Sequence, residues 1–198
     1  MQRAFITTMA FLFLSTITLA GNAGGDKKKD AEGFPPVERG PEHKVLGTLV
    51  GSWDAKVKFY FPDPTKPSES KGTMTRKLIL GGNFLHESFQ GEFVGKKFAG
   101  VALIGFDVNK KIFETVWCDS MSTSMTLSKG TYHPEKKTLI SVGEEFEPDS
   151  KKKVKTRDVL RIVGPDEQSL EMYRQPEGEE KEFKIMEIVF TRKKGDKQ

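Results

Sequence analysis

Short runs of alternating apolar and polar residues dominate the chain after residue 50. In the first run, 52–61, apolar residues recur at every second position from Trp53 to Phe61, with Asp54 and lysines mostly between them. A period of two is typical of a β-strand with one buried face. The three prolines in 62–67 cannot lie in a strand interior. The pattern therefore predicts a strand over 52–61 followed by a loop.

Nine further runs have the same character and are separated by turn residues such as Gly81-Gly82-Asn83 and Gly164-Pro165-Asp166. We predict strands at about 71–80, 84–93, 98–107, 111–119, 123–132, 138–146, 154–163, 169–173 and 182–192. Strands at this spacing indicate a barrel or sandwich, and short connections favour an up-and-down meander. Closure would remove exposed edges. The expected fold is all-β, an antiparallel barrel of about ten strands.

One short amphipathic helix precedes these strands. Pro41 and Glu42 suit a helix start, four apolar residues between Val45 and Val50 share one face, and Gly51 ends the segment. We expect this helix, 42–50, to close one end of the barrel. Trp53, which follows directly, is expected to be a core plug at that end.

Two segments resemble each other within the meander. Residues 105–113 and 130–139 each begin with glycine and an aromatic residue, continue into a turn carrying Lys-Lys, and end in an apolar run. Both predict hairpins with charged tips. We infer two similar hairpins and no duplicated domain.

The N-terminal segment is expected to be a cleaved targeting segment. Residues 1–23 contain Arg3, an apolar stretch to Leu19, and small residues that allow cleavage after Ala20 or Ala23. The stretch is too short for a comfortable membrane span, which leaves no integral span in the mature chain. We therefore predict a signal peptide and an exported protein, periplasmic or extracellular. An uncleaved N-terminal anchor is the alternative.

Three other segments complete the predicted domain organisation. Residues 24–41 are rich in Gly, Pro and charge and predict a flexible linker. The barrel domain is expected over 42–193, with a C-terminal tail at 194–198.

Charge and cysteine content exclude several classes of function. The chain carries 32 basic and 28 acidic residues, a formal charge of +4, and its lysine clusters are surrounded by acids. A mixed surface of this kind does not indicate a nucleic-acid partner. Cys118 is the single cysteine, so an intrachain disulfide is impossible, and its strand-like surroundings favour a structural role.

Several motifs resemble a known family. His43-x-x-Leu46 leading to Gly51-Ser52-Trp53 is followed by Leu80-Gly81-Gly82-Asn83-Phe84-Leu85, Gly105-Phe106-Asp107, Trp117-x-Asp119-Ser120 and Gly130-Thr131-Tyr132. Over about 42–193 the chain resembles the secreted bacterial family called domain of unknown function 1579. The resemblance implies a calycin-like barrel, related in shape to lipocalins, and no activity.

Some calycin-like barrels, the nitrobindins, bind haem through a histidine late in the chain. The histidines here are His43, His86 and His133, and none follows residue 133. The chain departs from that pattern, so we expect no haem and no other cofactor.

His86-Glu87 is the most reactive-looking pair. Adjacent strand residues point to opposite faces, so the two cannot easily act together. One of them is expected to face the interior and contact a ligand. The alternative is an ordinary hydrogen-bonded or exposed residue in each case.

Trp117 and Asp119 share one strand face. If that face points inward, an aromatic wall with a carboxylate at its rim suits a ligand pocket. The alternative is a core tryptophan beside an aspartate that forms the following turn.

Pairs of His or Cys at metal-ligand spacing are absent from the sequence, so no metal site is expected.

Three functions remain open. The favoured hypothesis is a non-enzymatic carrier of a small, largely apolar ligand inside the barrel, because the chain has 15 Phe and 7 Met residues to line a cavity. The alternatives are a structural or protein-interaction module with a solid barrel, and an enzyme using His86, Glu87 or Asp119 at the barrel mouth.

Overall fold

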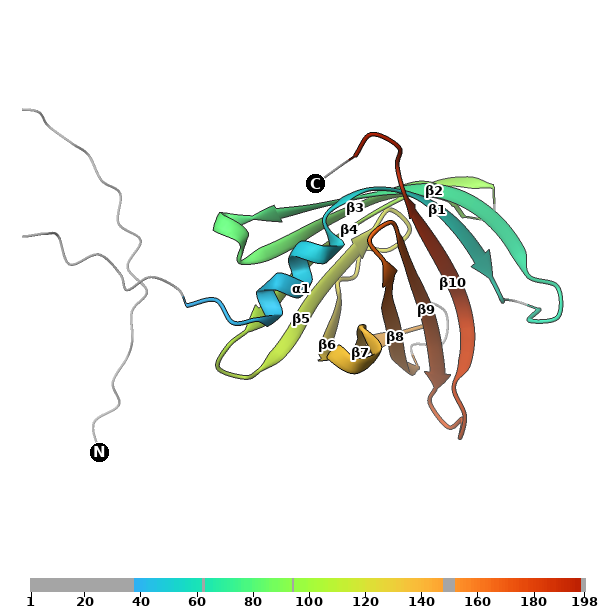
Figure 1. Cartoon of the computed structure of the whole chain (residues 1–198). Coiled ribbons are helices and arrows are strands. Elements are labelled where there is room, and N and C mark those ends of the chain that lie inside the picture. The colour runs from blue at the N-terminus through green and yellow to red at the C-terminus, as the bar shows by residue number, and fades with distance from the viewer. Residues whose placement is uncertain (1–37, 62, 94, 148–151, 197–198) are drawn as a thin grey trace, which may run out of the picture. The chain divides into compact units, whose positions relative to one another are not determined.

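The computed structural model describes residues 38–198 apart from 62, 94, 148–151 and 197–198. One helix, α1 (Glu42–Leu49), precedes ten strands (Figure 1). The strands are β1 (Gly51–Phe59), β2 (Ser68–Ile79), β3 (Phe84–Phe93), β4 (Lys96–Asp107), β5 (Ile112–Asp119), β6 (Thr126–His133), β7 (Thr138–Phe146), β8 (Lys153–Gly164), β9 (Glu167–Pro176) and β10 (Phe183–Arg192). The predicted helix and all ten strands are confirmed.

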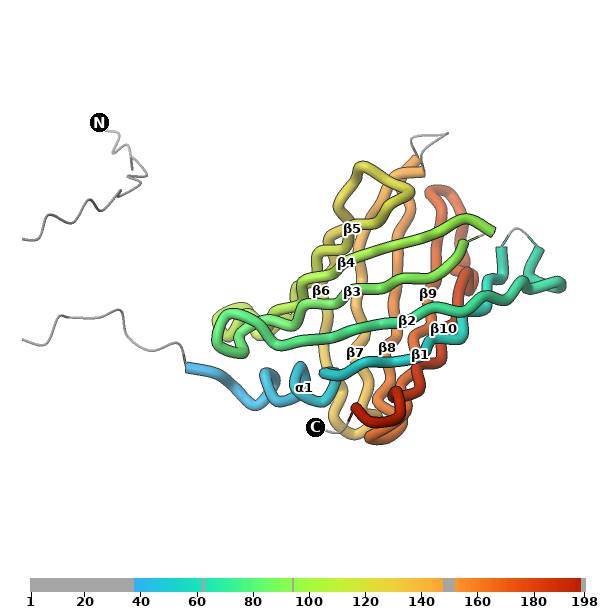
Figure 2. The backbone as a smooth tube through the Cα atoms, turned by 90° about the horizontal axis from the view of Figure 1, so that it is seen from above, coloured from blue at the N-terminus to red at the C-terminus, as the bar shows by residue number. Residues whose placement is uncertain are grey.

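The strands form one closed barrel in which each pairs antiparallel with its neighbours in sequence, and β1 pairs with β10. Seen from above, β2–β4 cross over β6–β9 at a steep angle (Figure 2). This is the predicted up-and-down barrel. Closure gives every strand two hydrogen-bonded partners, so the sheet has no free edge.

The two similar segments form hairpins, as predicted. Lys111, the second lysine of the first turn, has φ 56°, and Lys137, its counterpart in the second turn, has φ 48°. The amide of Lys111 donates to Asp107 O (2.7 Å), and the amide of Lys137 donates to Pro134 O (3.1 Å). The Lys-Lys pattern therefore marks the same left-handed turn position twice.

Helix α1 closes one end of the barrel, where it contacts β2, β3 and β4. Its apolar face buries Leu46 and Leu49 completely. Trp53, 0% exposed, donates from Nε1 to Leu49 O (3.2 Å) and lies 4.1 Å from the Arg192 guanidinium. Trp53 is thus the predicted plug, held between the helix and the end of β10.

The chain ends differ in part from the predictions. Strand β1 stops at Phe59, and Phe61, predicted as the last residue on its apolar face, is 67% exposed. The predicted signal peptide and the linker as far as residue 37 lie outside the described residues. The C-terminal segment folds back on β1: Lys193 N donates to Ser52 O, and Ser52 N donates to the Asp196 carboxylate. Within the described ranges, no helix is long and apolar enough to cross a membrane.

Candidate functional site

The barrel interior is filled at the end that α1 covers. Inward-facing Leu85, Phe113 and Phe190 are at most 1% exposed and pack with the buried face of the helix and with Trp53. These side chains form a close-packed core beneath α1.

Beyond this core, several inward-facing side chains are only half-buried, although Val57, Phe89 and Val154 on the same inner wall are buried. Strand register and alternation place these residues on the same face as buried Ala102 and Leu139: Thr115, Trp117, Ser128, Thr156, Met172 and Met186. A solid core would bury side chains in these positions. Solvent therefore reaches part of the inner wall at the end opposite α1; we call that end the mouth and the end under α1 the closed end.

Trp117 and Asp119 lie together on the inner wall near this mouth. Trp117 Nε1 donates to Asp119 Oδ2 (3.0 Å), and the other carboxylate oxygen accepts from Met121 N (2.9 Å). Phe98 stacks against the indole with ring centroids 6.5 Å apart. The structure thus brings these two predicted site residues together as an aromatic wall with an oriented carboxylate. Asp119 also forms the following turn, so both sequence interpretations describe part of its geometry.

His86 and Glu87 are separated by the sheet. Glu87 faces the interior and is 7% exposed. His86 lies on the outer face, between its register partners Lys77 and Leu103. The acid and base candidates His86, Glu87 and Asp119 therefore do not converge at one mouth.

Glu87 belongs to a buried polar network at the closed end. Arg76 Nε lies 2.5 Å from Glu87 Oε1, and Arg76 Nη1 donates to Gln168 Oε1 (2.6 Å). Gln168 Nε2 in turn donates to Thr48 O in α1 (3.2 Å). The Arg76 guanidinium also lies 4.6 Å from the centroid of the Phe190 ring. These contacts connect four strands, β2, β3, β9 and β10, to the helix, and they give Glu87 a structural role.

Asp158 on β8 is an interior carboxylate that the sequence analysis missed. It lies between its register partners Ser141 and Met172 on the inward face. Its Oδ1 is buried and has no hydrogen-bond partner among the described residues. Burial raises the pKa of Asp158 to about 7, and Glu145 adds to the rise while Arg174 and Arg157 oppose it. Perturbed carboxyls inside a cleft are candidates for functional sites.

A signal for Asp158 was present in the sequence. Val154, Leu160 and Ile162 share its strand face, so an acid occupies an otherwise mainly apolar face. Nearer the mouth, Arg174 on β9 forms an ion pair with Glu145 on β7 across β8. One wall of the open half is therefore polar, built from β7, β8 and β9.

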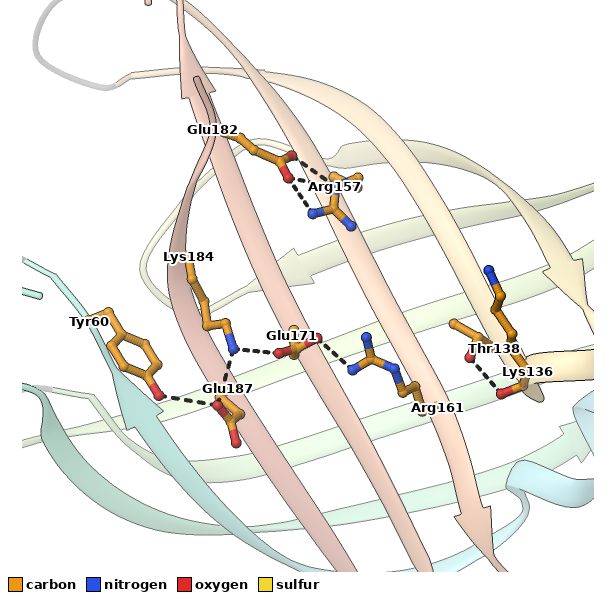
Figure 3. Close-up of polar contacts among 9 residues, drawn as sticks. All are labelled: Tyr60, Lys136, Thr138, Arg157, Arg161, Glu171, Glu182, Lys184 and Glu187. Carbon is orange, nitrogen blue, oxygen red and sulfur yellow. Dashed lines mark hydrogen bonds and ion pairs between the residues drawn. The ribbon is translucent and has the colours of Figure 1, made fainter. Parts of the chain in front are cut away.

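A second charged cluster lies on the outer face and has a structural role (Figure 3). Glu171 on β9 contacts Lys184 and accepts from Arg161 Nη1 (2.5 Å), and Lys184 lies 3.4 Å from Glu187, which accepts from Tyr60 Oη (3.1 Å). The chain of contacts crosses β8, β9, β10 and the segment after β1. Arg157 and Glu182 add a further ion pair beside it.

An open groove of about 1140 Å³ also lies on the outer face, across β4 to β9. Its apolar lining includes Leu127 and Val142, which are 64% and 55% exposed. Register partners of opposite charge flank it, Glu114 with Lys129 and Glu144 with Lys155.

No group of three or more His, Cys, Asp or Glu side chains that could hold a metal ion occurs in the part of the chain that the structure describes. Cys118 is half-buried and is a free cysteine.

The fold and its open interior define a calycin-like β-barrel, closed by a helix at one end. The chain belongs to the DUF1579 family, described as a protein of unknown function, whose model matches residues 38–192. This confirms the resemblance seen in the sequence motifs. A search of the curated proteins finds no match.

Two solved structures share the barrel. The crystal structure of Rv2717c from M. tuberculosis aligns with a TM-score of 0.60 and 20% sequence identity, over 79% of this chain and 100% of that chain. The S-type phycobiliprotein lyase CPES from Guillardia theta aligns with a TM-score of 0.54 and 9% identity, over 79% of this chain and 95% of that chain. At these identities the likeness concerns the fold.

Proposed function

We propose that this protein is a non-enzymatic carrier that holds a small, largely apolar ligand inside the open half of the barrel. One observation carries the proposal: several inward-facing side chains toward the mouth, among them Trp117, Met172 and Met186, are half-buried, whereas Leu85, Phe113 and Phe190 in the core under α1 are buried. An apolar pocket with a few polar groups is the usual form of a small-molecule site.

Two further points support a carrier. The ionisable candidates for acid–base chemistry do not meet in one place, since His86 lies outside and Glu87 is bonded to Arg76. A barrel of the same fold occurs in a protein named as a phycobiliprotein lyase, which is consistent with a barrel that receives a small ligand.

Native mass spectrometry of the protein purified gently from its own host tests the carrier directly. We expect a discrete extra mass that leaves on denaturation. An absorbance spectrum of the same sample tests for haem, and we expect no Soret band.

Tryptophan fluorescence supplies a second test that needs no natural ligand. The chain has two tryptophans, of which Trp53 is fully buried at the closed end and Trp117 lines the open half. Titration with decan-1-ol, an uncharged probe, should shift the emission of the wild type and of Trp53→Phe, and should leave Trp117→Phe unchanged. Absence of any shift together with a clean apo mass would overturn the carrier.

We also propose export of the chain, supported by the n-region, apolar stretch and small residues of 1–23. The intact mass of the host-derived protein should lack the residues up to Ala20 or Ala23. A mass that retains Met1–Ala23, or recovery in the cytoplasmic fraction, contradicts this proposal.

The outer groove favours a second candidate function, an interaction module. A second copy of the chain is the occupant it suits, because glutamates and lysines alternate along it and a two-fold axis can place opposite charges together. Sedimentation equilibrium should then show a dimer that Leu127→Lys dissociates. A monomeric wild type excludes this candidate.

A further inference from the structure

Among the inward-facing charges, the basic groups in the interior are already paired. Arg76 is bonded to Glu87 at the closed end, and Arg174 is bonded to Glu145 near the mouth. Asp119 and Asp158 form no salt bridge with any residue in the described ranges. The interior between the core and the mouth therefore has unbalanced negative charge.

The two carboxylates differ in how well they are satisfied. Both Asp119 oxygens accept a hydrogen bond, one from Trp117 Nε1 and one from Met121 N. Asp158 Oδ1 is buried and accepts none from the described residues. An unpaired buried polar atom costs free energy that a ligand can recover by donating to it. Of these two carboxyl groups, Asp158 is therefore the one with an oxygen that lacks a donor.

Aromatic rings on β4 and β5 suit the same ligand. Trp117 and Phe98 are stacked, and the indole of Trp117 is only half-buried on the inner wall. Aromatic faces attract organic cations, and a carboxylate in a partly desolvated site forms a stronger hydrogen bond with an ammonium than with a neutral donor. Both features favour a positively charged ligand over a carboxylate such as a fatty acid.

We propose that the barrel selects a cationic amphiphile, an apolar molecule with a primary ammonium group, whose head group donates a hydrogen bond to Asp158. This inference rests on the proposed carrier function and names the chemical class of its ligand. Asp158 anchors the head group midway along the barrel, while the Phe and Met side chains of the open half contact the apolar body.

Three probes with one chain length isolate the head group: decylamine, decan-1-ol and decanoate. With the mature protein at pH 8, calorimetry should show decylamine binding at least about tenfold more tightly than the other two, as expected for one charge-assisted hydrogen bond. Equal or tighter binding of decanoate would overturn the proposal. Decan-1-ol separates the carrier function from the preference for an ammonium group. Its binding supports the carrier function whether or not decylamine binds more tightly.

Asp158→Asn removes the charge and keeps the shape. We expect decylamine affinity to fall to within about threefold of decan-1-ol, whose own affinity should not change. The matched control is Asp54→Asn, the same substitution at a residue with its side chain 69% exposed on the outer face of β1. Retention of the full decylamine preference by Asp158→Asn would contradict the assignment.

A measurement on the wild type covers the case in which Asp158→Asn fails to fold. The charged groups acting on Asp158 are Glu145 from β7, Arg174 from β9 and Arg157 on its own strand. Because its pKa is about 7, Asp158 is about half protonated at pH 7, and a bound ammonium should drive it to the ionised form. Calorimetry in two buffers of different ionisation enthalpy should then detect release of about half a proton with decylamine and none with decan-1-ol. Equal proton release with both probes would refute the role of Asp158.

Discussion

Arg76 Nε lies 2.5 Å from Glu87 Oε1 inside the barrel, and the two side chains are 2% and 10% exposed. The residues are register partners on β2 and β3. Removal of both charges from water is costly, so the pair depends on its remaining contacts to Gln168 and to the Phe190 ring.

Glu87→Gln should destabilise the fold strongly because it leaves the buried Arg76 charge without a counter-ion. We expect a loss of about 3–5 kcal/mol in the free energy of unfolding, measured by urea denaturation. Glu92→Gln, on the same strand at an exposed position, is the control and should change stability by less than about 0.5 kcal/mol. A loss below about 1 kcal/mol for Glu87→Gln would show that the pair is not desolvated as described.

Asp158 should make the fold less stable as pH rises. Its folded-state pKa of about 7 exceeds the ordinary value of 3.8, so the folded state binds the proton more tightly than the unfolded state. The resulting stabilisation is complete below about pH 4 and is lost as pH rises through 7. Asp158→Asn, which mimics the protonated acid, should match the wild type at pH 4 and exceed it by a few kcal/mol at pH 8. Urea unfolding of both proteins across this range measures the difference, and parallel pH profiles would disprove the shift.

Gly100→Ala should displace the Trp117 indole. A Cβ at Gly100 would lie 2.2 Å from Trp117 Cζ2, and the same ring stacks on Phe98. We expect a shift in tryptophan emission and a loss of about 1–3 kcal/mol in stability from overpacking. Gly47→Ala in α1, where a Cβ meets nothing within 4 Å, should leave the emission unchanged. Unaltered emission in Gly100→Ala would show that the ring is not held over this glycine.

Lys184 should contribute to stability through the outer cluster of Figure 3. Burial is the largest single influence and lowers the pKa of Lys184, but its hydrogen bond and charge interaction with Glu171, together with Tyr173 and Glu187, outweigh burial and raise the pKa. Lys184→Met should cost about 1 kcal/mol in urea unfolding at low salt and less at high salt, since several charges form a network here. Lys153→Met removes a pair whose side chains are 58% and 57% exposed and should have no measurable effect. Equal effects of the two variants would contradict the network.

The sequence predicted the elements closely because its signals are local. Alternation and turn residues define β3 (Phe84–Phe93) and β7 (Thr138–Phe146) to the residue. Trp53 was recognised as a plug because a helix and a glycine precede it directly. The common face of Trp117 and Asp119 follows from the strand period alone.

Local signals of this kind could not predict the polar groups of the interior. Whether His86 or Glu87 faces inward depends on Arg76, which register places opposite Glu87 on another strand. Asp158 is significant because β7 and β9 surround it with Ser141, Glu145 and Arg174. These neighbours are separated from it by up to 17 residues in the chain, and no period within one strand identifies them.

The pairing of β1 with β10 has a consequence for how the chain matures. A ribosome delivers residues in order, so Arg192, the partner of Trp53 in this ladder, emerges long after it. Until then β1 keeps an unpaired edge, and the barrel cannot close around anything. The barrel of a nascent chain therefore stays open until β10 has been synthesised, although strands that are neighbours in sequence can pair before then.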